Sequence, residues 1–163
     1  MNISKKEKSC REAAAGWNKP THRELPTAPG ETVSTAAVLT EHGIEAEYLY
    51  FGTLTAKRFI AYLDVYVLAL LVGGKLLIMD NHPVHCSKAV KRFLEDHNVS
   101  FAFLPPYLPE LNPIEEAFSK IKHHIRKCKP RTAKALFDTI KSAIATVTED
   151  DVIGYTNHAA EYL

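Results

Sequence analysis

The sequence is poor in the features that mark secreted, disulfide-rich or membrane-spanning proteins. Its three cysteines, Cys10, Cys86 and Cys128, are an odd number without paired spacing, which argues against a disulfide framework and for a reducing, cytoplasmic location. The longest apolar stretch, which follows Asp64, is far shorter than the ~20 residues that a membrane span requires. No apolar run follows the basic first residues, so we expect neither a secretory signal nor a membrane partner.

Charge of one sign is also scarce. Lysine and arginine number 20 against 19 aspartates and glutamates, so any affinity for nucleic acid must depend on where the charges lie. At 163 residues, the chain is long enough for one domain with a core and too short for two ordinary ones. We expect an arm or loop over residues 1–31, an α/β core over 32–148 and a tail over 149–163.

Periodic apolar residues between turn signals predict the elements of that core. Val33–Thr40 and Ile44–Phe51, joined by a short turn with a glycine, predict a β-hairpin. Leu54–Val72 carries apolar residues at helical spacing and is followed by two glycines. Further helices are predicted from Pro113 to about Lys127 and from about Thr132 onward.

Two short apolar runs between these segments predict strands buried on both faces in the middle of a sheet. They are Lys75–Met79 and Ser100–Leu104, and Ser87 is suited to cap a helix between them. A strand, a helix and a second strand form a βαβ unit, in which the two strands pair in parallel. The sequence therefore predicts an α/β fold.

Two acidic residues are expected to meet at one edge of this sheet. Asp80 ends the first buried strand, and Glu115 begins the helix reached from the second strand. Because parallel strands end at the same edge, the two carboxylates can face each other across a crevice. A pair of oxygen ligands without nearby paired His or Cys suits Mg²⁺ or Mn²⁺ and phosphoryl-transfer chemistry.

Structural interpretations of both acids remain open on residue types alone. Asn112, Pro113 and Glu115 fit the first positions of a helix, where the glutamate can bond back to the cap as in a capping box. Asp80 with Asn81 is also an ordinary turn. His82, His85 and Cys86 lack the second ligand pair of a zinc site, so we expect local packing there.

Three motifs carry a resemblance to a known family. They are MDNHPVH, LPPYLPELNPIEEAF and the SKIKHHIRK that follows. In order, content and spacing they resemble the DDE transposases of the Tc/mariner superfamily and their bacterial insertion-sequence relatives. The resemblance implies an RNase H-like fold, a mixed sheet with helices on both faces. It also implies metal-dependent DNA cleavage and strand transfer, with three acids holding two divalent metal ions.

The family pattern assigns roles to residues of this chain. Asp80 matches the second acid, with Asn81 and His85 completing its motif and shaping the site. Glu115 matches the last acid, preceded by Asn112, and 115 − 80 − 1 leaves the characteristic 34 residues between the two acids. This spacing selects Glu115 over its neighbour. The implied partners are transposon-end and target DNA, with a homodimer or a full-length transposase as further possibilities.

The chain departs from the pattern at the first acid. No aspartate precedes Asp64, which falls inside a predicted helix, and the first strand of the family's fold has no counterpart. We therefore expect an N-terminally truncated catalytic domain that lacks this strand, which would lie between the hairpin and the strand ending at Asp80. With two ligands instead of three, we expect negligible strand transfer by this chain alone.

A basic segment follows the last acid. The candidate DNA-binding residues are Lys120, Lys122, Arg126 and Lys127, and no acid occurs from Ala117 to Phe137. Such a segment would hold DNA phosphates, although it equally fits a solvated helix face. The alternative function is a non-catalytic fragment that binds DNA or inhibits a full-length transposase. A nucleotide-binding or receiver-type domain fits poorly, because the P-loop residues and the early acidic pair are missing.

Overall fold

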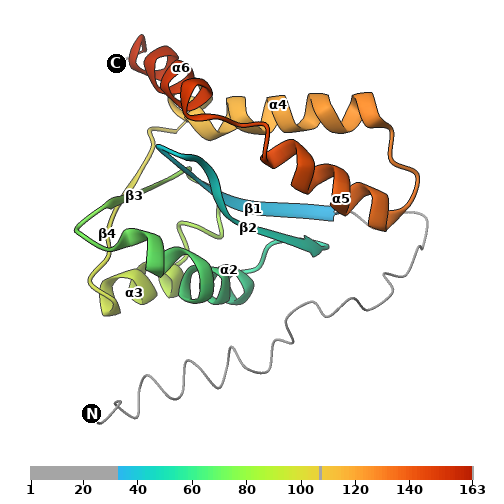
Figure 1. Ribbon diagram of the computed structural model, residues 1–163. Coiled ribbons are helices and arrows are strands. Elements are labelled where there is room, and N and C mark those ends of the chain that lie inside the picture. The colour runs from blue at the N-terminus through green and yellow to red at the C-terminus, as the bar shows by residue number, and fades with distance from the viewer. Residues whose placement is uncertain (1–32, 107, 163) are drawn as a thin grey trace.

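The computed structural model describes residues 33–106 and 108–162, which are arranged in three layers (Figure 1). A β-hairpin forms the middle layer, with α2 (Ala56–Tyr62) and α3 (Lys88–Asp96) on one side of it. The other side is covered by α4 (Pro113–Cys128), α5 (Ala133–Ile144) and α6 (Glu149–Ala160). The arm predicted for residues 1–31 lies outside the described residues. In the described part of the chain, no helix combines the length and apolar character needed to cross a membrane.

The hairpin pairs β1 (Val33–Thr40) with β2 (Gly43–Phe51) in antiparallel register, with a bulge between Ala36 and Val38. Alternate side chains of a strand point to opposite faces, so the hairpin serves two cores. Tyr48 packs with the α2 and α3 layer, and Leu49 packs with the C-terminal helices. Gly43 has a φ of 120°, and an added Cβ there would lie 2.8 Å from the Val147 carbonyl oxygen, so the turn requires glycine.

The segment predicted as a single helix over Leu54–Val72 is helical from Ala56 to Leu71 but changes type. Thr55 caps α2 by accepting a hydrogen bond from the Arg58 amide. A π-helical turn over Leu63–Val67 and a 3₁₀ turn over Leu68–Leu71 follow. Asp64 therefore lies in a helical turn, as predicted.

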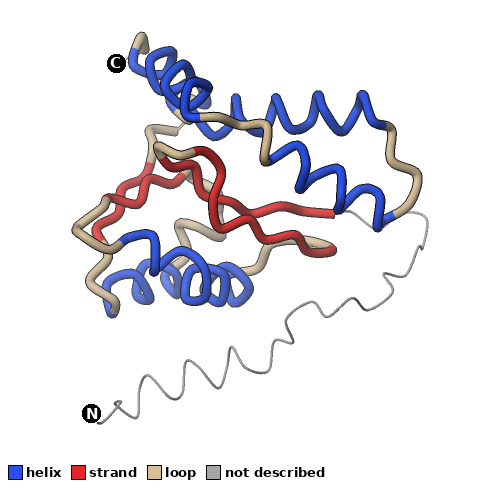
Figure 2. Tube along the Cα trace, viewed as in Figure 1, coloured by secondary structure: helices blue, strands red, loops and turns tan. Residues whose placement is uncertain are grey.

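The predicted βαβ unit is confirmed. β3 (Leu76–Met79) pairs in parallel with β4 (Ser100–Phe103), and Ser87 caps α3 between them by accepting from the Val90 amide. Figure 2 shows the strands in red, with β3 and β4 beside the hairpin.

The prediction that β3 and β4 are buried on both faces is wrong. Leu77 and Met79 are buried against α2 and α3, whereas Leu76 and Ile78 are 53% and 57% exposed. β4 is only partly buried. The apolar run is therefore covered by one helical layer rather than two among the described residues.

The four described strands form two separate two-stranded sheets. Residues of both, Tyr48 from the hairpin and Met79 from β3, nevertheless pack into the same core over α2. Within residues 33–106 and 108–162, no hydrogen-bonded strand joins the two sheets. The expected lack of the family's first strand stays a prediction, because residues 1–32 lie outside the described part of the chain. The parallel pairing of β3 and β4 leaves their C-terminal ends at one edge, where the candidate site lies.

Candidate active site

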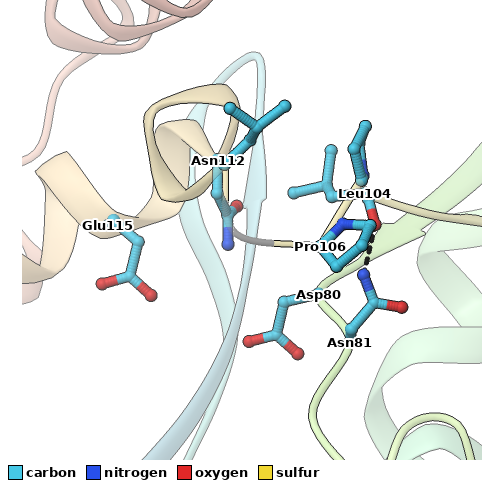
Figure 3. Close-up of a pocket in the computed structure, with 8 residues that line it drawn as sticks. Asp80, Asn81, Leu104, Pro106, Asn112 and Glu115 are labelled. Atoms are coloured by element: carbon cyan, nitrogen blue, oxygen red, sulfur yellow. Dashed lines mark hydrogen bonds between the residues drawn. The ribbon is translucent and has the colours of Figure 1, made fainter.

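Asp80 and Glu115 line the same pocket, which has a volume of about 260 Å³. The pocket is built where β3 ends, where the chain leaves β4 and where α4 begins; its other lining residues are Asn81, Leu104, Pro105, Pro106, Leu108 and Asn112. Figure 3 shows the two carboxylates directed to the same side of the pocket. Two acids that are distant in the sequence thus lie at one edge of the parallel strands, as expected because parallel strands end at the same edge.

Asp80 is held by the turn that follows β3. Its Oδ1 accepts a hydrogen bond from the backbone amide of His82 at 3.0 Å and lies 2.6 Å from Nδ1 of His85. The Asp80 side chain is 46% exposed. Oδ2 has no hydrogen-bond partner among the described residues, so one oxygen of the carboxylate is tied to the protein and the other is available to a ligand.

His85 connects Asp80 to the core. Its ring centroid lies 4.4 Å from that of Phe59, a buried residue of α2. Burial lowers the pKa of His85, although the neighbouring Asp80 carboxylate acts to raise it. Because a carboxylate oxygen only accepts hydrogen bonds, Nδ1 of His85 donates its proton to Oδ1 of Asp80.

Asn81 ties the two strand ends together. Its side-chain amide donates a hydrogen bond to the carbonyl oxygen of Leu104, and the Leu104 amide donates to Met79 O at 2.9 Å. The loop bearing Asp80 is thereby fixed to the exit of β4, which leads toward Glu115. Asn81 lines the pocket and, within the described part of the chain, makes no hydrogen bond to the Asp80 carboxylate.

The two neighbouring glutamates of α4 have different environments. Glu115 is exposed and lines the pocket, whereas Glu116 Oε1 lies 2.8 Å from Nδ1 of His158 on α6. Asn112 occupies the N-cap position, but no side-chain capping bond is made, so the capping-box interpretation of Glu115 finds no support. The structure therefore distinguishes Glu115 from Glu116 in the same direction as the motif spacing does.

The donor set of the pocket fits a hard divalent cation. Asp80 and Glu115 supply carboxylate oxygens, and no described residues form a group of three or more His, Cys, Asp or Glu side chains that could hold a metal ion. His82, His85 and Cys86 do not make such a group in the described part of the chain. Two carboxylates with room for water or phosphate oxygens are the ligands that Mg²⁺ accepts.

The basic residues of α4 divide into two groups. Lys120 is engaged with the C-terminal helix, because its Nζ donates to Asp151 Oδ2 at 2.5 Å and to Thr146 O at 2.8 Å. Lys122, Arg126 and Lys127 are exposed. Lys122 and Arg126 lie seven and eleven residues after Glu115, which places all three on one stripe of the helix. Exposed Ser119 lies on the same stripe, four residues after Glu115, at a spacing that is visible in the sequence but that charge does not reveal.

The sequence matches the family described as DDE superfamily endonuclease over residues 4–137, which is most of the chain. The chain belongs to the DDE endonuclease superfamily. The transposase of the transposable element Tcb2 from Caenorhabditis briggsae is 32% identical over 62 residues, covering 38% of this chain and 23% of that protein. The resemblance to Tc/mariner transposases that the motifs indicated is confirmed.

Solved structures with a similar fold include those of the Mos1 mariner transposase. The Mos1 strand transfer complex has a TM-score of 0.70 at 18% identity, covering 86% of this chain and 43% of the Mos1 chain. The Mos1 catalytic domain with Raltegravir and Mg has a TM-score of 0.63 at 12% identity, covering 98% and 94%. The Mos1 paired end complex with Mn has a TM-score of 0.68 at 19% identity, covering 85% and 43%.

These similarities confirm the RNase H-like α/β fold predicted for the chain. The chain spans about a quarter of the length of the Tcb2 transposase and under half of the Mos1 transposase in the strand transfer complex.

Proposed function

We propose that the pocket between Asp80 and Glu115 holds a divalent metal ion, Mg²⁺ or Mn²⁺, in a catalytic domain for DNA transposition. The observation that carries the proposal is that these two carboxylates, 34 residues apart in the sequence (115 − 80 − 1), line one pocket. The Mos1 paired end complex with Mn and the Mos1 catalytic domain with Raltegravir and Mg support the same choice of metal.

The protein's part in this chemistry is binding and positioning. A bound divalent ion would supply charge stabilisation for cleavage and joining of phosphodiester bonds. Asp80 and Glu115, which come from the end of β3 and the start of α4, would hold it with their carboxylate oxygens. Lys122 and Arg126 would hold DNA phosphates along the stripe that begins at Glu115. Lys127 is also proposed to bind DNA, although it lies off that stripe. Lys120 is the weakest of the four DNA-binding candidates because Asp151 already pairs with it.

One observation favours the alternative function for the chain acting alone. The pocket offers two carboxylates and, among the described residues, no third. We therefore propose that strand transfer by this chain alone is negligible; the alternative function is that of a non-catalytic fragment that binds DNA or a full-length transposase. Nicking of supercoiled plasmid in Mg²⁺ or Mn²⁺ that disappears in Asp80→Ala would overturn the proposed inactivity.

Titration calorimetry with Mn²⁺ tests the metal site independently of catalysis. Asp80→Asn and Glu115→Gln are each expected to weaken Mn²⁺ binding by at least about tenfold, since each removes a charged ligand. Glu116→Gln is the matched control, because the neighbouring carboxylate faces His158 and not the pocket. Equal weakening by Glu115→Gln and Glu116→Gln, or no binding by the unmodified chain, would refute the site.

A further inference from the structure

The turn after β3 offers two donors to one oxygen of Asp80. The His82 backbone amide and the His85 ring both bond to Oδ1, at 3.0 and 2.6 Å. A carboxylate at neutral pH has only acceptor oxygens, so the His85 proton must lie on Nδ1. These two donors restrict the rotation of the Asp80 carboxylate more than the His82 amide would alone.

His85 is itself fixed from behind by the hydrophobic core. Its side chain is 18% exposed, and its ring packs on Phe59, which is 6% exposed. Phe59 belongs to α2 and contacts the same core that buries Leu77 and Met79 of β3. The strand that ends at Asp80 and the ring that bonds to Asp80 are therefore held by one packed cluster.

We propose that His85 is a positioning residue: by donating Nδ1–H to Oδ1 of Asp80, and with its ring seated on Phe59, it presents Oδ2 to a cation in the pocket shared with Glu115. This inference rests on the proposed metal site. His85 does not touch the cation in this arrangement. Residues that orient a metal ligand through a hydrogen bond commonly contribute ten- to a hundredfold to metal affinity, so the predicted effect is large enough to measure.

The chain provides a matched control for the His85 contact. His97 also makes a tilted ring contact with a phenylalanine, with its ring centroid 4.2 Å from that of Phe93. It also uses Nδ1 in a hydrogen bond, to the Phe93 carbonyl oxygen. It lies at the end of α3 and does not line the pocket. His97→Leu therefore repeats the loss of an imidazole on an aromatic ring without affecting Asp80.

The experiment measures Mn²⁺ affinity by calorimetry in four folded proteins, with folding checked by thermal unfolding. His85→Leu keeps bulk against Phe59 but removes the donor, and it is expected to weaken Mn²⁺ binding about 10- to 100-fold. His85→Asn, whose amide can reach the same oxygen, is expected to recover most of the affinity. His97→Leu is expected to bind as the unmodified chain does.

A second readout needs no metal. Nitrogen-15 NMR of the imidazoles in the metal-free protein is expected to show His85 protonated on Nδ1. The Nε2–H form, or equal Mn²⁺ affinity in His85→Leu and the unmodified chain, would overturn the inference while leaving the metal site intact. Absence of Mn²⁺ binding by the unmodified chain would instead overturn the proposed site, and the inference with it.

Discussion

At the scale of single residues, Tyr62 has an unusual position. Its side chain is 3% exposed in the core over α2, and its hydroxyl finds no hydrogen-bond partner among the described residues. Burial raises the pKa of this hydroxyl strongly, because the charged form would be desolvated. A buried hydroxyl without a partner costs about 1–3 kcal/mol, so the ring contributes to stability and its oxygen detracts from it.

Tyr62→Phe is therefore expected to leave the free energy of unfolding unchanged or to raise it by up to about 1 kcal/mol, measured by urea denaturation. Tyr66→Phe is the control, since that ring lies in a tilted contact with Tyr62, 6.0 Å between centroids, but is 36% exposed. It should change stability by less than about 0.5 kcal/mol. If Tyr62→Phe instead lowered the free energy of unfolding by more than about 1 kcal/mol, the Tyr62 hydroxyl would have a hydrogen-bond partner, which would contradict this prediction.

Residue types alone identified Asp80 and Glu115 as candidate site residues, but they did not distinguish a metal-binding role from a structural one. The motif spacing favoured Glu115 over Glu116, and the structure separates them through His158, a residue 42 positions away from Glu116. The contact of Lys120 with Asp151 is similarly distant in sequence. Neither partner could be predicted, because no local pattern links α4 to α6.

At the scale of elements, the limits of helices and strands were predictable where turns and caps mark them. Ser87 and Thr132 cap the helices that their positions predicted, and Pro113 begins α4 as predicted. The burial of β3 was not predictable, because a continuous apolar run does not reveal whether one or two layers cover it. Leu76 and Ile78 show that only one does among the described residues.

The C-terminal helix α6 is held by polar pairs at both ends. His42 Nδ1 lies 2.7 Å from Glu149 Oε1 at its start, and His158 near its end pairs with Glu116. Hydrogen bonds to these carboxylates raise the pKa of both histidines above the ordinary value. Their contribution to stability is therefore fully present below the pKa of the unfolded chain, about 6.5, and is lost as pH rises through the folded-state pKa.

The double variant His42→Gln with His158→Gln tests this dependence. The difference in free energy of unfolding between the unmodified chain and the variant is expected to be larger near pH 6 than near pH 8, measured by urea denaturation at each pH. Taking the difference removes the effect of groups that titrate alike in both proteins. A difference that grows with pH would contradict the assigned pairs.

At the scale of the whole molecule, charge is distributed rather than abundant. The formal net charge is +1, yet Lys122 and Arg126 extend from the pocket along one stripe of α4. Local arrangement rather than total charge therefore carries the proposed affinity for DNA, and such contacts weaken with salt.

Arg126→Ala is expected to weaken DNA binding and to reduce the slope of log affinity against log salt by roughly one, since one phosphate contact is lost. Fluorescence anisotropy with a labelled duplex at several salt concentrations measures both quantities. Lys57→Ala is the control, because this exposed lysine lies on α2 in the opposite helical layer. Equal effects of the two variants would show that the stripe on α4 has no special part in DNA binding.

The fold as a whole could be predicted in class but not in detail. The parallel pairing of β3 and β4 followed from the βαβ rule, and it alone brought Asp80 and Glu115 to one edge. The separation of the described strands into two sheets was not predicted, because the family resemblance implied a mixed sheet that lacks one strand. Composition and periodicity do not report which strands remain unpaired.

Anomalous X-ray diffraction from crystals grown with Mn²⁺ tests the central claim most directly. The account predicts one strong manganese peak between Asp80 and Glu115, at about 2.1 Å from a carboxylate oxygen of each, the short distance expected for a small hard cation. A peak bound to other residues, or none at this pocket at saturating Mn²⁺, would contradict it.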